Sequence, residues 1–244
     1  MGVRHEERLT GVLLLFVAAL GWGQTADELV AKNLAARGGA EKLRAIRSLV
    51  ITGTISFGEQ SSPITVKAWR PNQIREEFKV QGTEITRAYD GKTGWAIQKN
   101  GDQSKVSVLS GGDADNIAEE AENAIEGPLL DYAKKGSKVE ALGKDTAGGK
   151  PVYRLKITTH TGTSITQFLD VVTYLEIHEA IERTVDGKLT LIVEDVGDYR
   201  EVGGVKFAHR FVSGTQENPQ ASTLQIEKME LNVPIDSSVF ALPK

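Results

Sequence analysis

Four histidines are the side chains of this 244-residue chain best suited to ligate a transition metal or to act as a general base. They are His5, His160, His178 and His209. A zinc-binding helix needs a second histidine four residues after the first, and His178-Glu179 lacks it and lies in a strand-like pattern. Because the chain has no cysteine, thiol catalysis, disulfides and cysteine-ligated zinc or iron–sulfur centres are excluded. We therefore expect surface or core histidines and no bound metal.

Asp113 and Asp115 have the spacing that opens a calcium-binding loop. The twelfth position of such a loop requires a glutamate, but that position is Ala124. We interpret the pair as the start of a helix, whose positive end favours acidic side chains. The chain also lacks the Gly-x-Ser-x-Gly and Gly-x-x-x-x-Gly-Lys motifs of serine hydrolases and phosphate-binding loops. We therefore predict no catalytic residue and no cofactor, and we do not expect an enzyme.

A hairpin over residues 64–78 holds a charged residue of more interest. A loop of residues 71–73 would place residue 70 opposite residue 74 and would set Arg70 near the rim of an apolar face. The apolar residues sharing that face would be Ile64, Val66, Ala68, Ile74, Phe78 and Val80. A guanidinium there needs hydrogen-bond acceptors. Two interpretations remain open: Arg70 binds backbone carbonyls of helices inserted later in the chain, or it pairs with Glu76, its diagonal neighbour.

The elements that would position these residues change character along the chain. Two helices are predicted over residues 25–37 and 40–46, the first with Thr25 as N-cap and Glu28 completing a capping box. From Leu49 onward the hydrophobic period is two, which predicts about a dozen β-strands. A segment of helical composition, residues 111–135, interrupts them, and we interpret it as two short helices separated at residues 127–128.

So many consecutive strands cannot lie flat without leaving a long face in water, so the sheet must curl. We predict a mainly β protein, a half-open antiparallel β-barrel of about a dozen strands with an N-terminal helix and a short helical lid insertion. Candidate ligand-binding residues in the concave pocket and lid are Ile55, Val66, Ile74, Phe78, Ile85, Trp95, Leu129 and Leu130. The alternative interpretation is that each is a core residue under a permanently packed lid.

The first 23 residues predict export. Arg4 and Arg8 precede an apolar run over residues 11–20, and glycines at 21 and 23 fit a cleavage site. The run is roughly half the length of about twenty residues that a membrane span needs. We predict a signal peptide over residues 1–23 and a single domain over residues 24–244, and the alternative is an uncleaved anchor. The net charge of −4 does not favour nucleic acid as a partner.

Three segments resemble the LolA-type periplasmic lipoprotein carriers and the broader outer-membrane lipoprotein-sorting proteins. They are Trp69-Arg70-Pro71-Asn72, residues 89–95 (YDGKTGW) and residues 235–240 (IDSSVF). The resemblance implies a half-open barrel whose helical lid is latched by an arginine that matches Arg70. It differs in two features: Ile74 and Glu76 stand where the carriers have aromatic residues, and the lid segment is acidic rather than rich in phenylalanine.

The resemblance implies a periplasmic, monomeric carrier that shelters acyl chains without doing chemistry. Its partners would be an acylated lipoprotein or a lipid, with membrane-bound donor and acceptor proteins on either side of the transfer. An alternative is a periplasmic lipid-sensing regulator of the same fold, for which an additional domain is expected. A lipid- or glycan-modifying enzyme and a scaffold with a filled interior are weaker alternatives.

Overall fold

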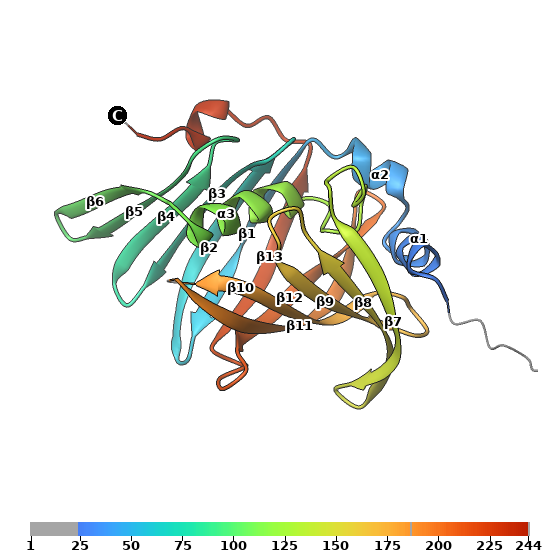
Figure 1. The fold of residues 1–244 in the computed structure, drawn as a ribbon. Coiled ribbons are helices and arrows are strands. Elements are labelled where there is room, and N and C mark those ends of the chain that lie inside the picture. The colour runs from blue at the N-terminus through green and yellow to red at the C-terminus, as the bar shows by residue number, and fades with distance from the viewer. Residues whose placement is uncertain (1–23, 186, 244) are drawn as a thin grey trace, which may run out of the picture.

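The computed structural model describes residues 24–185 and 187–243, and the predicted signal peptide lies outside them. The described chain is one antiparallel sheet in the order β6-β5-β4-β3-β2-β1-β13-β12-β11-β10-β9-β8-β7, curled around a hollow and open between β6 and β7 (Figure 1). The prediction of a mainly β, half-open barrel is confirmed, with thirteen strands. The strands are β1 Ser48–Phe57, β2 Gln60–Trp69, β3 Gln73–Val80, β4 Thr83–Tyr89, β5 Gly94–Asn100, β6 Gln103–Val108, β7 Lys138–Ala147, β8 Lys150–Thr158, β9 Ser164–Asp170, β10 Glu176–Val185, β11 Lys188–Val202, β12 Val205–Thr215 and β13 Ser222–Leu231.

Helices cover parts of the curled sheet. Helix α1 (Ala26–Ala36) begins with the predicted capping box, in which the Thr25 hydroxyl accepts from the Glu28 N–H and the Glu28 carboxylate accepts from the Thr25 N–H. It packs on β7–β9, while α2 (Ala40–Ala45) packs with β1, β12 and β13. A short 3₁₀ helix, η1 (Ser237–Phe240), lies against β3 near the end of the chain.

The inserted segment, residues 111–135, contains one helix rather than the predicted two. Helix α3 (Gly112–Asn123) forms, whereas residues 124–136 are a series of turns. Backbone with positive φ at Gly127 (77°), Asp131 (53°) and Gly136 (76°) is incompatible with a right-handed helix, which is why the second one is absent. Helix α3 lies across the concave side between β3–β5 and β10 (Figure 1).

The hairpin between β2 and β3 keeps the predicted faces but not the predicted register. Trp69 pairs with Gln73 and Val66 with Glu76, so the loop is residues 70–72 and the pairing is two residues away from the prediction. Arg70 is the first residue of the loop, and its N–H donates to the Arg47 carbonyl at 3.0 Å. A shift of two preserves the faces, so the alternation of inward and outward side chains was predicted correctly.

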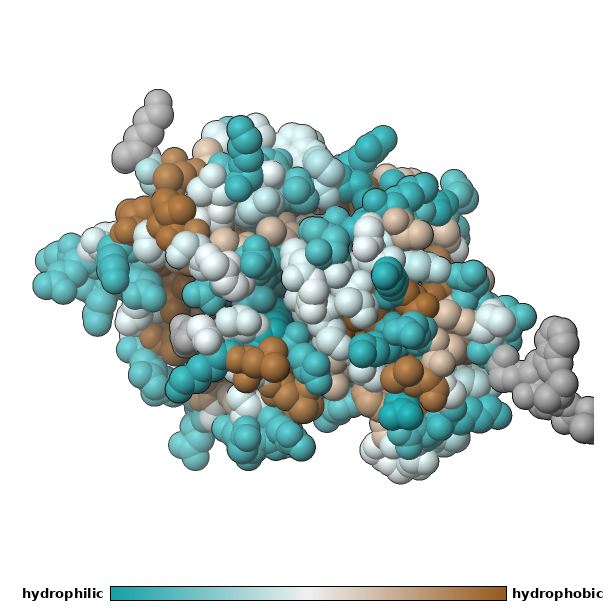
Figure 2. Space-filling view, in the orientation of Figure 1, coloured by the Kyte–Doolittle hydropathy of each residue, from teal (hydrophilic) through white to brown (hydrophobic). Residues whose placement is uncertain are grey.

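No described helix is both long and apolar enough to cross a membrane. The apolar side chains on the face seen in Figure 2 gather in small separate patches among hydrophilic ones. The large apolar surface of the chain instead faces inward, in three clusters between the sheet and α1, α2 and α3.

Candidate functional site

A cavity of about 600 Å³ lies between the concave face of the sheet and the inserted segment. Its size falls in the range of small-molecule sites. One half of its wall is apolar and comes from β1, β2, β3, β12 and β13. Side chains in that half include Leu49, Ile51, Ile55, Ile64, Val66, Ile74, Phe78, Phe211, Leu224, Ile226 and Met229.

Five of the predicted ligand-binding residues line this cavity: Ile55, Val66, Ile74, Phe78 and Leu129. Ile85 pairs with Phe78 across β3 and β4, so it shares the concave face but lies outside the cavity wall. Leu130 is fully buried beside Leu43 in the cluster under α2, so it anchors the inserted segment rather than lining the cavity.

Trp95 lies on the opposite face of the sheet, so its placement in the pocket was wrong. It pairs with Ala88, whereas the neighbouring Ala96 pairs with Arg87, which lines the cavity. The buried indole needs a hydrogen-bond acceptor, and its Nε1–H donates to the Phe240 carbonyl of η1 at 2.9 Å. The hydrophobicity of Trp95 predicted a position in the pocket. The register of β5 instead places the indole on the opposite face of the sheet, where η1 covers it.

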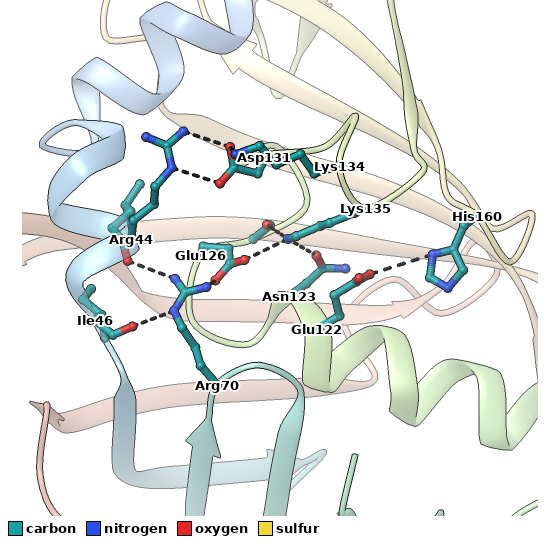
Figure 3. Close-up of polar contacts among 12 residues, drawn as sticks. Arg44, Ile46, Arg70, Glu122, Asn123, Glu126, Asp131, Lys134, Lys135 and His160 are labelled. Atoms are coloured by element: carbon teal, nitrogen blue, oxygen red, sulfur yellow. Dashed lines mark hydrogen bonds and ion pairs between the residues drawn. The ribbon is translucent and has the colours of Figure 1, made fainter. Parts of the chain in front are cut away.

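Arg70 joins three parts of the chain at the rim of the concave face (Figure 3). Its Nε donates to the Ile46 carbonyl at 2.6 Å and its Nη2 to the Leu43 carbonyl at 3.0 Å, both at the end of α2. Its Nη1 lies 2.5 Å from a carboxylate oxygen of Glu126 in the inserted segment. The carbonyls thus belong to α2 rather than to the insertion. The alternative pair with Glu76 does not form, because Arg87 binds that carboxylate.

Glu126 is the centre of a buried polar cluster that the sequence did not single out. Its side chain is 6% exposed, and Lys135 Nζ lies 3.1 Å from its second carboxylate oxygen. The Arg37 Nη1 of α1's C-cap donates to the Glu126 backbone carbonyl at 2.6 Å. Three cations therefore contact Glu126: Arg37 and Arg70 from outside the inserted segment, and Lys135 from within it.

A second ion pair ties the same turns to α2. Two of the three guanidinium nitrogens of Arg44, Nε and Nη2, donate to Asp131 at 2.9 Å (Figure 3). These bonds hold the pKa of Asp131 well below its ordinary value. The acidic character of the insertion, a departure from the carriers in sequence, is therefore matched by basic residues on the elements it contacts.

Helix α3 is held over the cavity by its own glutamates. The Glu120 carboxylate lies 3.0 Å from Arg87 of β4 and 2.9 Å from Arg183 of β10, so it links the two sides of the curled sheet. Glu119 is buried and accepts hydrogen bonds from the hydroxyls of Thr159 and Thr161. The helix thus bridges the concave face rather than resting on one strand.

The rest of the cavity wall is mixed: Ile181, Ile192 and Val196 lie beside a group of polar side chains from β9, β10 and β11. This group includes Gln167 of β9, Glu176 of β10 and Glu194 of β11, with Glu179 hydrogen-bonded behind Gln167. Desolvation, with a further contribution from neighbouring carboxylates, raises the pKa of Glu194 to about 7 and lifts that of Glu176 well above its ordinary value. Desolvation also raises the pKa of Glu179. We call these four residues the carboxyl wall.

The predicted absence of a histidine site can be examined for three of the four histidines. His178 pairs with Asp195, His209 is buried against the Phe207 carbonyl, and His160 lies near Glu122, whereas His5 is outside the described residues. Within residues 24–185 and 187–243 no cluster of three potential metal-ligating side chains occurs. What the described chain brings together is a half-open, largely apolar cavity framed by charged side chains.

Comparison with known proteins identifies the fold. No protein-family model and no curated protein matches the sequence. A LolA superfamily protein from Nitrosomonas europaea superposes with a TM-score of 0.57 at 12% identity, over 89% of this chain and 98% of that one. An outer membrane lipoprotein-sorting protein domain from Vibrio parahaemolyticus gives 0.55 at 12% identity, over 87% and 94%. A DUF1329 family protein from Desulfovibrio piger gives 0.54 at 13% identity, over 86% and 95%. The chain therefore has the LolA-like fold, as its sequence motifs suggested.

Proposed function

We propose that this protein is an exported, periplasmic carrier that shelters the acyl chains of a lipid or lipoprotein in the cavity and does no chemistry on them. The observation that carries the proposal is the cavity of about 600 Å³ with one apolar half, enclosed by a segment held by ion pairs. The neighbours with the same fold include a lipoprotein-sorting domain, which supports a cargo of this class.

The energetics favour such a cargo. Burying one methylene contributes about 0.8 kcal/mol, so a chain of roughly ten methylenes would gain about 8 kcal/mol. A carrier must also release its cargo, which requires an opposing free energy. In this proposal the inserted segment supplies it, because cargo must displace turns that already pack on α2 and β1 through Leu130. Arg70 acts as the latch that sets the balance between the closed and the loaded state.

Native mass spectrometry tests the proposal directly. Protein purified without detergent should carry an added mass that denaturation releases, and the released molecule should be an acylated lipid or peptide. Val66→Trp fills the apolar half of the cavity and should abolish the added mass, whereas Val106→Trp, at a half-exposed position on β6, should retain it. Circular dichroism checks that both variants fold. A wild-type protein that is empty and also takes up no lipid from vesicles would refute the carrier function.

A further inference from the structure

The carboxyl wall contains hydrogen-bond acceptors that nothing in the described chain satisfies. Gln167 is 3% exposed, and its Nε2 donates to Glu176 at 3.1 Å and to Glu179 at 3.2 Å. In this orientation the amide N–H groups donate to both carboxyl groups. Its Oε1 is therefore left as a buried acceptor, and neither it nor Glu176 Oε1 has a partner among the described residues.

The same wall also gathers three carboxyl groups that pair with no cation among the described residues. In the part of the chain that the structure describes, no ion pair joins Glu176, Glu179 or Glu194 to a cation. Arg183 is committed to Glu120, and Arg37 donates to the Glu126 carbonyl. Glu176, Glu179 and Glu194 are half-buried, and ionising a partly desolvated carboxyl without a paired cation is costly. The raised pKa values of all three reflect that cost.

The two parts of the cavity would therefore bind chemically different parts of one ligand. The apolar part accommodates a hydrocarbon chain, and the polar part presents hydrogen-bond acceptors and carboxyl groups that can ionise beside a cationic ligand. A protonated primary amine supplies three N–H donors and one positive charge. Nε of Arg183 is a buried donor without an acceptor on the same side, and a hydroxyl or ester oxygen next to the amine would satisfy it.

We propose that the carboxyl wall is a binding site for the protonated amine of an amphiphile whose hydrocarbon chain occupies the apolar half of the cavity. The inference rests on the proposed function for the placement of the chain and adds the chemistry of the head group. It assigns Gln167 Oε1 and the carboxylates of Glu176 and Glu194 as the amine's acceptors.

Calorimetric titration of lipid-stripped protein at pH 7 with dodecylamine, dodecanol and dodecanoic acid, each below its micelle concentration, tests the site. Dodecylamine should bind at least tenfold more tightly than dodecanol, and dodecanoic acid should bind most weakly. Glu176→Gln combined with Glu194→Gln should remove the preference for the amine. Glu182→Gln, an exposed position on the same strand, should keep it.

A second measurement needs no variant. Titrations in two buffers of different ionisation enthalpy should show that wild-type protein releases protons when the amine binds, because carboxyls protonated in the empty cavity ionise beside the ammonium. Dodecanol should release none. Equal affinity for amine and alcohol without proton release overturns the amine site but leaves the carrier function intact. Failure of all three ligands to bind overturns the carrier function and the amine site together. If the double variant does not fold, proton release by the wild-type protein alone tests the amine site: release supports the site and its absence overturns it.

Discussion

Arg70 and Glu126 form the contact on which opening of the cavity should depend most directly. The guanidinium satisfies two carbonyls at the end of α2 and one carboxylate of the inserted segment, so it holds both to the start of the β2–β3 hairpin loop. Removing one partner of a buried ion pair leaves the other charge uncompensated, which is more damaging than the net value of the pair. Lys135 remains on Glu126 and limits the effect.

We expect Arg70→Leu to retain bound lipid longer than wild type, because the closed state loses the latch while the loaded state does not. With a weakening of about 1.4 kcal/mol the release rate should fall about tenfold. Stopped-flow transfer of a fluorescent acyl probe from protein to acceptor vesicles measures it. Arg210→Leu, at an exposed position on β12, should release at the wild-type rate. Identical release from the Arg70 variant and wild type would exclude a latch.

At the scale of elements, α3 is the strap whose displacement should admit cargo. Its first residue, Gly112, is so close to β10 that a Cβ there would lie 2.9 Å from the Thr184 Cβ. Cβ atoms joined by a disulfide are about 3.8 Å apart, so two cysteines need a shift of only about 1 Å to form one. The chain has no cysteine of its own to interfere.

We therefore expect the double variant Gly112→Cys, Thr184→Cys to exchange lipid at least tenfold more slowly when oxidised than after reduction. The disulfide would pin the start of α3 to β10 and hold the cavity closed. The same acyl-probe transfer assay, with and without dithiothreitol, measures the ratio. The single variant Thr184→Cys should exchange lipid at the same rate in both conditions. Unchanged exchange in the oxidised protein would assign the motion to residues 124–136 instead.

What the sequence could predict about these elements follows from backbone geometry. Alternation along a strand is a local property, so the inward faces of β2 and β3 and the capping box of α1 were predicted correctly. The register of the β2–β3 hairpin was not, because two pairings that differ by two residues put the same side chains on the same faces, so alternation cannot distinguish them.

The carboxyl wall escaped prediction for a related reason. Glu176 and Glu179 are three residues apart, so strict alternation would point them to opposite faces of the sheet. A register shift between Glu176 and His178 brings both to Gln167, and irregularities of this kind leave no clear mark in the sequence. The partners of Arg70 were likewise hidden, since Glu126 lies in turns that the composition presented as a helix.

At the scale of the whole molecule, the carboxyl wall should make stability depend on pH. Glu176, Glu179 and Glu194 have folded-state pKa values above the ordinary value of 4.5, about 7 for Glu194. The folded protein therefore binds more protons than the unfolded chain between about pH 4.5 and 7. The groups that face these carboxyls, Arg37, Glu120, Arg183 and Tyr199, are part of the same balance.

The free energy of unfolding should accordingly fall as pH rises from about 5 to 7.5, with up to about 3 kcal/mol from Glu194 alone. Urea unfolding of lipid-stripped protein at several pH values measures the slope. Glu194→Gln should flatten it, and Glu182→Gln should not. Carboxyls with a lowered pKa, such as Asp131, make the free energy of unfolding rise with pH, but only in a more acidic range. A wild-type stability that rises steadily across this interval would contradict the assignment of these buried acids.

The gap between β6 and β7 affects how far the curled sheet can widen. A closed barrel has a fixed circumference, because widening it would break backbone hydrogen bonds along an entire seam. Here the two terminal strands share no such seam, and the span between the arms is bridged instead by the side chains of Glu120, Arg87 and Arg183. If the proposed carrier function holds, we expect this span to widen for larger cargoes by breaking a few ion pairs, with the strand pairing of the sheet kept intact.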